Sequence, residues 1–422
     1  LPQMTENVRY DGSLKASVIL KDLAPFVPAL SRFEEPLDLN LVFSGHGKHL
    51  DCPTLRLTNH HGLMIAGEAA LSNWDAGMDM YIYGKLGNLT MTKEGINVLM
   101  TNLTGKVPPI LQRLDYIRFN GEAAGYLHDL TLTGLFHTGA GMVKTDVMMS
   151  IDEQSMSRTY SGSVASADLD LGKLLNQEKK FGKVDFNVEL KGFNYKNRYP
   201  ESYIKGIISS FEYSQYQYEN IMLDGVYKDG GFNGRLSMDD ANGSVQIDGN
   251  FNVAKTIPDF NLKASVKNLR PHDLHLSDKY ENASISLGLT ADFTGKSIDD
   301  MNGRISLDSL QLNAPDEGGC FLDNLTITAG QVSGEKELRI NSSFMTAVIR
   351  GDYTYHTIPA SVVKTVQRYI PSLLTIKDNM PEPHNNFQFD ICLENTEVLS
   401  KLFQIPLELY LPASLKGYFN DG

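Results

Sequence analysis

Apolar and polar residues alternate along most of this chain, and that alternation limits its possible folds more than any other feature. In residues 285–293, ISLGLTADF, the odd-numbered positions are apolar and the even-numbered positions are mainly polar. Successive side chains of a β-strand point to opposite faces, so this pattern indicates a strand with one apolar and one wet face. Strands buried in parallel sheets are apolar throughout. The sequence therefore predicts a mainly β protein made of antiparallel strands.

The same period of two recurs at residues 37–43, 245–253 and 260–266. Asn-Gly and Asp-Gly pairs are also frequent, and these pairs tolerate the positive φ that two-residue hairpin turns need. Consecutive hairpins form a meander, in which each strand pairs with the preceding one. We expect turns at six such pairs: Asp11-Gly12, Asn120-Gly121, Asp229-Gly230, Asn233-Gly234, Asn242-Gly243 and Asn302-Gly303.

Short helix-like segments interrupt the strands. The sequence predicts helices near residues 20–33, 168–180 and 358–374, and a shorter one after Pro108-Pro109. Asp168, Asn268 and Asn395 are suitable N-caps because a short side-chain oxygen accepts hydrogen bonds from first-turn amides. We interpret the helix-then-strand units as internal repeats, spaced by about 100 to 150 residues. The predicted segments are 1–160, 161–376 and 377–422, the last being the truncated start of a further repeat.

Composition and charge exclude some functions. Acidic residues outnumber basic ones, 51 to 38, and the formal net charge is −13. Binding to nucleic acid depends on Lys and Arg neutralising phosphates, so we expect no nucleic-acid partner. No stretch approaches ~18 uninterrupted apolar residues, so no transmembrane helix is expected. The three cysteines (Cys52, Cys320 and Cys392) lie far apart, which argues against a disulfide framework.

Motifs for catalysis or metal binding are missing. The histidine-containing strings HGKH (46–49), with His60 and His61 nearby, and PHDLH (271–275) lack the Glu or Cys of known zinc motifs. We interpret these side chains as loop histidines. GAGMVKT (139–145) resembles a phosphate loop, but Val143 occupies the position where that motif needs glycine before the lysine. The sequence predicts no enzyme, no metal and no cofactor.

Several segments together resemble the TamB branch of the AsmA-like proteins, in its Bacteroidetes form. They are SVASADLDLGKLL (163–175), FGKVDFNVELKGF (181–193), the run that starts at Ile204 and ends at Asn252, DFTGKSIDDMNGRISLDSLQL (292–312), the run that starts at Ser342 and ends at Leu374, and EVLSKLFQIPLEL (397–409). The motifs are loose strings of Gly, Leu and Asp. Their order, across about residues 15–420, is what carries the resemblance.

The resemblance implies a periplasmic protein anchored in the inner membrane by an N-terminal helix that this fragment lacks. It implies a long antiparallel sheet curled into an open U-shaped groove (β-taco-like), with a few short helices between strands. The apolar groove would carry phospholipid acyl chains between the inner and outer membranes. It also implies a possible outer-membrane partner of the BamA type, bound through a region outside this chain.

The alternation alone favours a closed sandwich core over an open groove. The resemblance favours the groove, and an open twisted sheet of more than about ten strands tends to curl. A hydrocarbon chain would suit its apolar face, because each buried methylene contributes about 0.8 kcal/mol. Alternation selects these lipid-binding candidates: Leu39, Leu41, Phe43, Val184, Phe186, Val188, Leu190, Val245, Ile247, Phe251, Ile285, Leu287, Leu289, Phe293, Ile305 and Leu307.

Two other functions remain open at this point. The protein could be a structural scaffold or assembly factor for outer-membrane proteins, acting through exposed sheet edges that template a partner strand. A carbohydrate-binding β-solenoid would need aromatic platforms on the wet face, and the single tryptophan, Trp74, argues against it.

Overall fold

The computed structural model describes residues 8–23, 31–152, 154–155, 157–194, 201–278, 281–297, 299–315, 318–358, 361, 385–403 and 412–420. The chain divides into two compact units, Leu1–Val226 and Tyr227–Gly422. The described strands form one long antiparallel sheet of 23 strands that is not closed into a barrel and carries few helices. This confirms the predicted mainly β, antiparallel fold class. The predicted segment boundaries remain a prediction.

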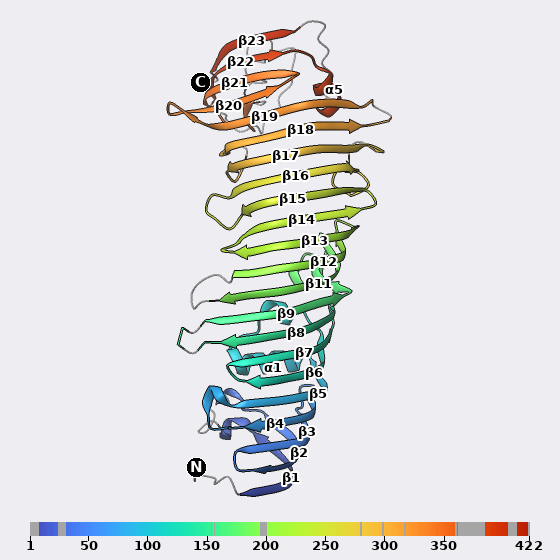
Figure 1. Ribbon diagram of the computed structural model, residues 1–422, viewed down its shortest axis with the longest axis vertical. Helices are drawn as coiled ribbons and strands as arrows, with labels where there is room; N and C mark the ends of the chain where they lie inside the picture. Colours follow the sequence, from blue (N-terminus) through green and yellow to red (C-terminus); the bar gives the residue numbers. More distant parts are fainter. Residues whose placement is uncertain are drawn as a thin grey trace. The chain divides into compact units, whose positions relative to one another are not determined.

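The elements of the first unit are numbered as in Figure 1. In chain order they are β1 (Arg9–Ile19), η1 (Leu20–Leu23), β2 (Pro36–His46), β3 (His49–Thr58), β4 (Leu63–Ser72), η3 (Gly77–Asp79), β5 (Tyr81–Thr92), α1 (Lys93–Thr104), α2 (Pro109–Gln112), β6 (Tyr116–Tyr126), β7 (Asp129–Thr138), β8 (Gly141–Ile151), β9 (Arg158–Ala167), β10 (Leu169–Asp170), α3 (Leu171–Leu175), β11 (Phe181–Asn194), β12 (Glu201–Tyr213) and β13 (Tyr216–Lys228), the last of which runs across the division.

The second unit continues with strands of similar length. They are β14 (Gly231–Asp240), β15 (Gly243–Asn252), β16 (Asp259–Leu269), β17 (Ser284–Thr294), β18 (Asn302–Asn313), β19 (Cys320–Val332), β20 (Glu335–Ser342), β21 (Met345–Asp352), β22 (Asn386–Leu393), helix α5 (Glu397–Phe403) and β23 (Ala413–Asn420).

Within each unit, strands that follow one another in the chain lie next to one another and pair antiparallel (Figure 1). In the first unit this holds from β1 to β9 and from β9 through β11 to β12. In the second unit it holds from β14 to β23. The predicted meander is therefore present in both units.

Most of the Asn-Gly and Asp-Gly pairs do not form turns, and this part of the prediction is wrong. Only Asp229-Gly230 adopts a hairpin turn, with φ values of 50° and 77°. Gly243 begins β15 directly after its turn, and the other four pairs lie inside strands or at a strand's start. Gly12 shows the physical reason: a Cβ there would lie 2.9 Å from the ring of Phe43 on the neighbouring strand. Gly12 therefore makes room for an aromatic ring of the neighbouring strand.

The predicted helices are only partly correct. The 168–180 segment contains α3, which ends at Asn176 (φ 57°), and β11 already begins at Phe181. Its N-cap is Asp170, whose carboxylate accepts from the Lys173 amide at 2.8 Å, and not Asp168. No helix follows Asn268 in the described residues, and α5 begins two residues after Asn395. The short helix after Pro108 is present as α2.

Two other helix predictions fall largely on residues outside the described ranges. Of the predicted helix near 20–33, the structure describes the 3₁₀ turn η1 and residues 31–33. Nearly all of the predicted helix at 358–374 lies outside the described residues, as does the proposed boundary after residue 377.

Helix α1 was not expected from the sequence, and it is the longest helix in the described part of the chain. At its N-terminus the Thr92 hydroxyl accepts a hydrogen bond from the Gly95 amide, and at its C-terminus Gly105 adopts a left-handed conformation with φ 77°. Both features are standard helix caps. Alternate strands of a meander run in the same direction, so the β5–β6 and β9–β11 connections lie at the same end of the strands. Helices α1, α2 and α3 therefore all lie at one end of the strands of the first unit.

These three helices share a small core with the sheet. Ile96 of α1 is 1% exposed and belongs to one cluster with the buried residues Leu114, Ile117, Ala140 and Leu174. The second unit has three separate clusters around its later strands. One contains Tyr353 and Phe387, one contains Leu312 and Cys320, and the third joins Val398 of α5 to Leu322.

Glu337 of β20 is buried between two arginines, which makes it a pH-sensitive element. Its carboxylate accepts from Arg350 Nε and from an Arg339 guanidinium nitrogen, both at 2.9 Å, and these charged hydrogen bonds hold the pKa of Glu337 below its usual value. A lowered folded-state pKa stabilises the fold above the unfolded-state pKa, near 4.3, and that stability is lost as the pH falls through the folded value.

We therefore expect Glu337→Gln to destabilise the second unit by about 1–3 kcal/mol at pH 7, because charged hydrogen bonds are lost. The variant should also lose less stability than the wild type on acidification from pH 5. Urea denaturation at pH 7 and below pH 5 measures both effects. Glu335→Gln, at an exposed position two residues earlier, is the control. If the free energy of unfolding of the wild type and of Glu337→Gln depended equally on pH, Glu337 would not be the pH-sensitive element.

Candidate functional site: the apolar face of the sheet

The apolar residues of the second unit form a continuous face across its strands. Residues directly opposite each other in an antiparallel sheet lie on the same face, so the strand register defines this surface. One row of direct neighbours runs from β14 to β19 through Leu236, Ile247, Ala264, Leu289, Leu307 and Leu325. A second row runs from β17 to β23 through Ala291, Ile305, Ile327, Ile340, Ala347, Ile391 and Leu415.

Aromatic rings extend this face toward the other end of the strands. Phe232, Phe251, Phe260 and Phe293 occupy one row across four consecutive strands. The rings of Phe260 and Phe293 are stacked with their centroids 4.7 Å apart. The register thus places the predicted residues of β15, β17 and β18 on one surface.

The first unit has an equivalent face. One row runs from β1 to β8 through Ala16, Leu39, Leu57, Ile65, Leu89, Phe119, Phe136 and Val143. Leu41 and Val188 belong to the adjacent row, which reaches β12 at Gly206. The predicted residues of β2 and β11 therefore share one face of this unit, and Phe136 of that face packs against the cluster to which Ile96 of α1 belongs.

The predicted residues are not buried as the core of a sandwich would be. Val184 is buried and Phe251 is 37% exposed, while all the others are half-buried. Five of them pack against the clusters of the second unit: Phe293, Ile305, Ile285, Leu287 and Leu307. The structure therefore divides the candidates into residues beneath neighbouring segments and residues on an open surface.

Strands β14, β15 and β16 carry the most open part of this face. Their only buried residues are Gly231 and Asn252, so none of their apolar side chains is buried. A second sheet packed on this surface would bury those side chains almost completely. Here the apolar face has water-accessible surface along three neighbouring strands.

The opposite face of the same strands is polar and held by cross-strand ion pairs. Arg235 Nε of β14 lies 2.6 Å from Asp248 of β15, and further along the same face Lys416 Nζ of β23 lies 3.0 Å from Asp390 of β22. Such exposed pairs contribute little stability individually. These pairs show that the charged residues lie mainly on the face opposite the apolar side chains.

The middle of the first unit's apolar face is lined by small residues. Gly84 lies directly between Ala69 and Ala123 on its neighbouring strands, and Gly121 lies opposite Gly134. The Phe119 ring covers Gly134, because a Cβ there would lie 2.4 Å from that ring. Gly84 differs, since a Cβ at this position would meet no atom within 4 Å. The surface above Gly84 is therefore open.

We expect Gly84→Leu to fold normally and to gain up to about 1 kcal/mol, because glycine inside a strand is unfavourable. Gly162→Leu should instead destabilise the first unit by about 1–3 kcal/mol, because Gly162 has a φ of 143°. A Cβ there would also lie 2.0 Å from the Asp146 carbonyl oxygen. Urea denaturation compares the two variants. Strong destabilisation by Gly84→Leu would mean that the apolar face is closed at this point.

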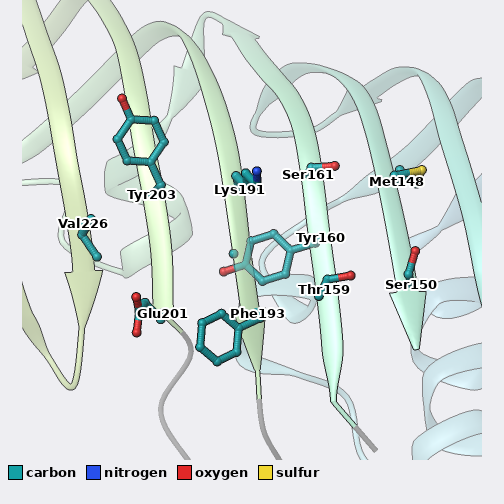
Figure 2. Close-up of a pocket in the computed structure, with 11 residues that line it drawn as sticks. Met148, Ser150, Thr159, Tyr160, Ser161, Lys191, Phe193, Glu201, Tyr203 and Val226 are labelled. Atoms are coloured by element: carbon teal, nitrogen blue, oxygen red, sulfur yellow. The ribbon is translucent and has the colours of Figure 1, made fainter. Parts of the chain in front are cut away.

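A shallow depression of about 470 Å³ lies elsewhere in the first unit (Figure 2). Its lining includes the polar or charged residues Ser161, Lys191 and Glu201. Figure 2 shows the Tyr160 ring lying across β11, where a Cβ on Gly192 would meet it at 2.6 Å. None of the sixteen predicted residues lines this depression. We therefore do not assign it to the candidate site.

The histidines and cysteines do not form a chemical centre. Nowhere in the described ranges do three or more His, Cys, Asp or Glu side chains gather closely enough to hold a metal ion. His49 instead bonds to Ser72 Oγ at 2.7 Å and to Asp51 at 2.9 Å. All three cysteines are free. Among the described helices, none is both long and apolar enough to cross a membrane.

The sequence interpretation missed the residues that α1 adds to this face. Val98 and Leu99 line a cavity together with side chains of β2, β3 and β4. Thr92 and Gly105, with Ile96 and Met100 at helical spacing between them, were the available signals.

No protein-family model, curated protein or solved structure matches the chain.

Proposed function

We propose that this protein is a periplasmic lipid-transfer segment whose apolar sheet face binds phospholipid acyl chains between the inner and outer membranes. The membrane assignment follows the resemblance to the TamB branch of AsmA-like proteins. The binding mode follows the chemistry of the sheet. The proposed carrier residues are the predicted ones outside the core clusters, above all Val245, Ile247 and Phe251.

The observation that carries this proposal is the open apolar surface of β14, β15 and β16. Its apolar side chains are half-buried or exposed, although they fill most positions on one face of three adjacent strands. A water-exposed apolar patch on several strands is typical of a binding surface. Hydrocarbon is the matching ligand, because methylene groups gain about 0.8 kcal/mol each on burial and need no polar partner.

The same surface suits movement along the sheet. Contacts between methylene groups and side chains such as Ile247 and Leu289 have no direction and no preferred register. A chain lying across successive strands would therefore exchange equivalent contacts as it advances. No covalent step is required, and the residues act only by their shape and apolar character.

Native mass spectrometry of protein purified without detergent tests the proposal. We expect bound phospholipid, and we expect delipidated protein to take up lipid from vesicles of phosphatidylethanolamine and phosphatidylglycerol. A fluorescent phospholipid should also move faster from donor to acceptor vesicles when the protein is present. Lipid-free protein that takes up nothing from these vesicles would reject lipid transfer as its function.

The edges of the sheet support a second candidate, a scaffold or assembly factor for outer-membrane proteins. In the described part of the chain β1 pairs with β2 alone, and β23 pairs with β22 alone. An unpaired edge can add a strand from another protein. Binding of an extended outer-membrane β-hairpin peptide by lipid-free protein, detected as slowed amide exchange in β1 or β23, would favour this candidate.

A further inference from the structure

A separate apolar cavity lies in the first unit, between α1 and the strands β2, β3 and β4. Its volume is about 190 Å³. Leu37 and Leu63, each 6% exposed, form its most buried walls. The other apolar lining residues are Phe33, Leu57, Ile65, Val98 and Leu99. We call this cavity the α1 pocket.

The α1 pocket is held open by the way α1 is fixed. Ile96 and Met100 pack into the cluster shared with α2 and α3, whereas Val98 and Leu99 line the pocket. The helix is capped at both ends, and its position is set by the cluster on the other side. Closing the pocket would therefore require α1 to leave that cluster.

Three polar residues also line the α1 pocket: Glu35, Asn59 and Asn102. The Asn59 side-chain oxygen already accepts from the amides of His61 and Leu63, at 3.0 and 2.8 Å. The Glu35 side chain is 37% exposed as a whole, but its Oε2 atom is shielded from solvent. Within the described residues this oxygen has no hydrogen-bond donor, although His61 Nε2 approaches to 3.3 Å. Glu35 is therefore an acceptor available to a ligand.

We propose that the α1 pocket binds one end of a straight aliphatic chain whose head is a hydrogen-bond donor, such as a hydroxyl or ammonium group. A dry cavity of about 150 Å³ lined by Leu, Ile and Phe holds benzene. The larger α1 pocket therefore suits about six to eight carbons of an aliphatic chain. The head group would donate to Glu35 Oε2. A carboxylate head would meet the like charge of Glu35 and is disfavoured. The α1 pocket lies beneath α1 on the first unit's apolar face, which carries Leu57 and Ile65, and it shares no residue with the open surface of β14, β15 and β16.

Titration calorimetry at pH 7.5 with 1-octanol and octanoate tests the assignment. We expect one octanol per chain and at least tenfold weaker binding of octanoate. Leu99→Trp should fill the α1 pocket and abolish octanol binding, and Val98→Phe should weaken it at least fivefold. Glu35→Gln should bring octanol and octanoate within about threefold of each other. Ser265→Asp, on the polar face of the second unit, is the control and should bind octanol as the wild type does.

Urea denaturation of each variant establishes that it is folded. If Leu99→Trp is unfolded, octanol binding by Val98→Phe tests the site instead. Octanol binding that survives in both folded variants would overturn the site. Equal binding of octanol and octanoate by the wild type would overturn the role of Glu35. Phospholipid uptake is measured on the same samples. A wild type that binds octanol but takes up no phospholipid would contradict the proposed function and leave the α1 pocket standing.

Discussion

Ala264→Asp is expected to reduce phospholipid binding at least tenfold while the protein stays folded. Ala264 lies on the apolar face between Ile247 and Leu289 and is half-buried. A carboxylate there can keep its contact with water when no lipid is bound. A bound acyl chain would remove that water, and desolvating an unpaired charge costs several kcal/mol. Native mass spectrometry and vesicle uptake measure the loss.

The neighbouring residue supplies a matched control. Ser265→Asp places the same charge one residue further along β16, on the polar face near Lys263 and Lys267. We expect lipid binding close to that of the wild type. Far-ultraviolet circular dichroism and urea denaturation then separate two outcomes for Ala264→Asp. A folded protein without lipid supports the open face, whereas an unfolded protein would place Ala264 in a sealed core and contradict lipid binding there.

Ile96→Ala should be the most destabilising single substitution in the first unit, costing about 2–5 kcal/mol. Ile96 is 1% exposed and is the contact through which α1 joins the residues around Leu114, Ile117 and Leu174. The cavity left behind cannot refill, because α1, α2 and β6 enclose it. Urea denaturation, with limited proteolysis within α1 as a second measurement, reports the loss.

Leu99→Ala is the comparison for this experiment. Leu99 lies on the same helix but is half-buried and borders an existing cavity, so its replacement should cost less than about 2 kcal/mol. If Leu99→Ala cost as much as Ile96→Ala, α1 would be held to the sheet through its pocket-lining side. The assigned core would then be wrong.

The strands and their faces could be predicted from the sequence, because each depends on local alternation. Residues 245–253 show this well: the odd-numbered apolar positions from Val245 to Phe251 all lie on one face of β15. The pairing order could also be predicted, because consecutive strands joined by short turns form a meander. The predicted lining residues consequently lie on one face in each unit.

Helices and turns were harder to predict. The sequence of α1, KEGINVLMTNLT, is rich in Asn, Thr and β-branched residues, which are weak helix formers. Tertiary contacts through Ile96 outweigh that weakness. The prediction of turns at Asn-Gly and Asp-Gly pairs failed for a similar reason, since Gly12 makes room for the ring of Phe43 on another strand. Local sequence does not report contacts that come from elsewhere in the chain.

The extent of coverage of the apolar face could not be predicted either. Leu287 and Ile247 have the same pattern in the sequence. Leu287 packs against the cluster that contains Phe344 and Val398, which are far away in the chain, whereas Ile247 belongs to no such cluster. Which candidates remain available to a ligand depends on these long-range contacts.

The placement of α1, α2 and α3 at one end of the strands has a mechanical consequence for the first unit. Their shared core stiffens the rim of the sheet formed by that end of the strands. The described part of the opposite rim, formed by the other end of the strands, has only turns and η3. Bending motions should therefore concentrate at that second rim, where local unfolding costs least. A phospholipid entering from the side would find room for its head group there, and bridging two strands at this rim with a disulfide should slow its entry.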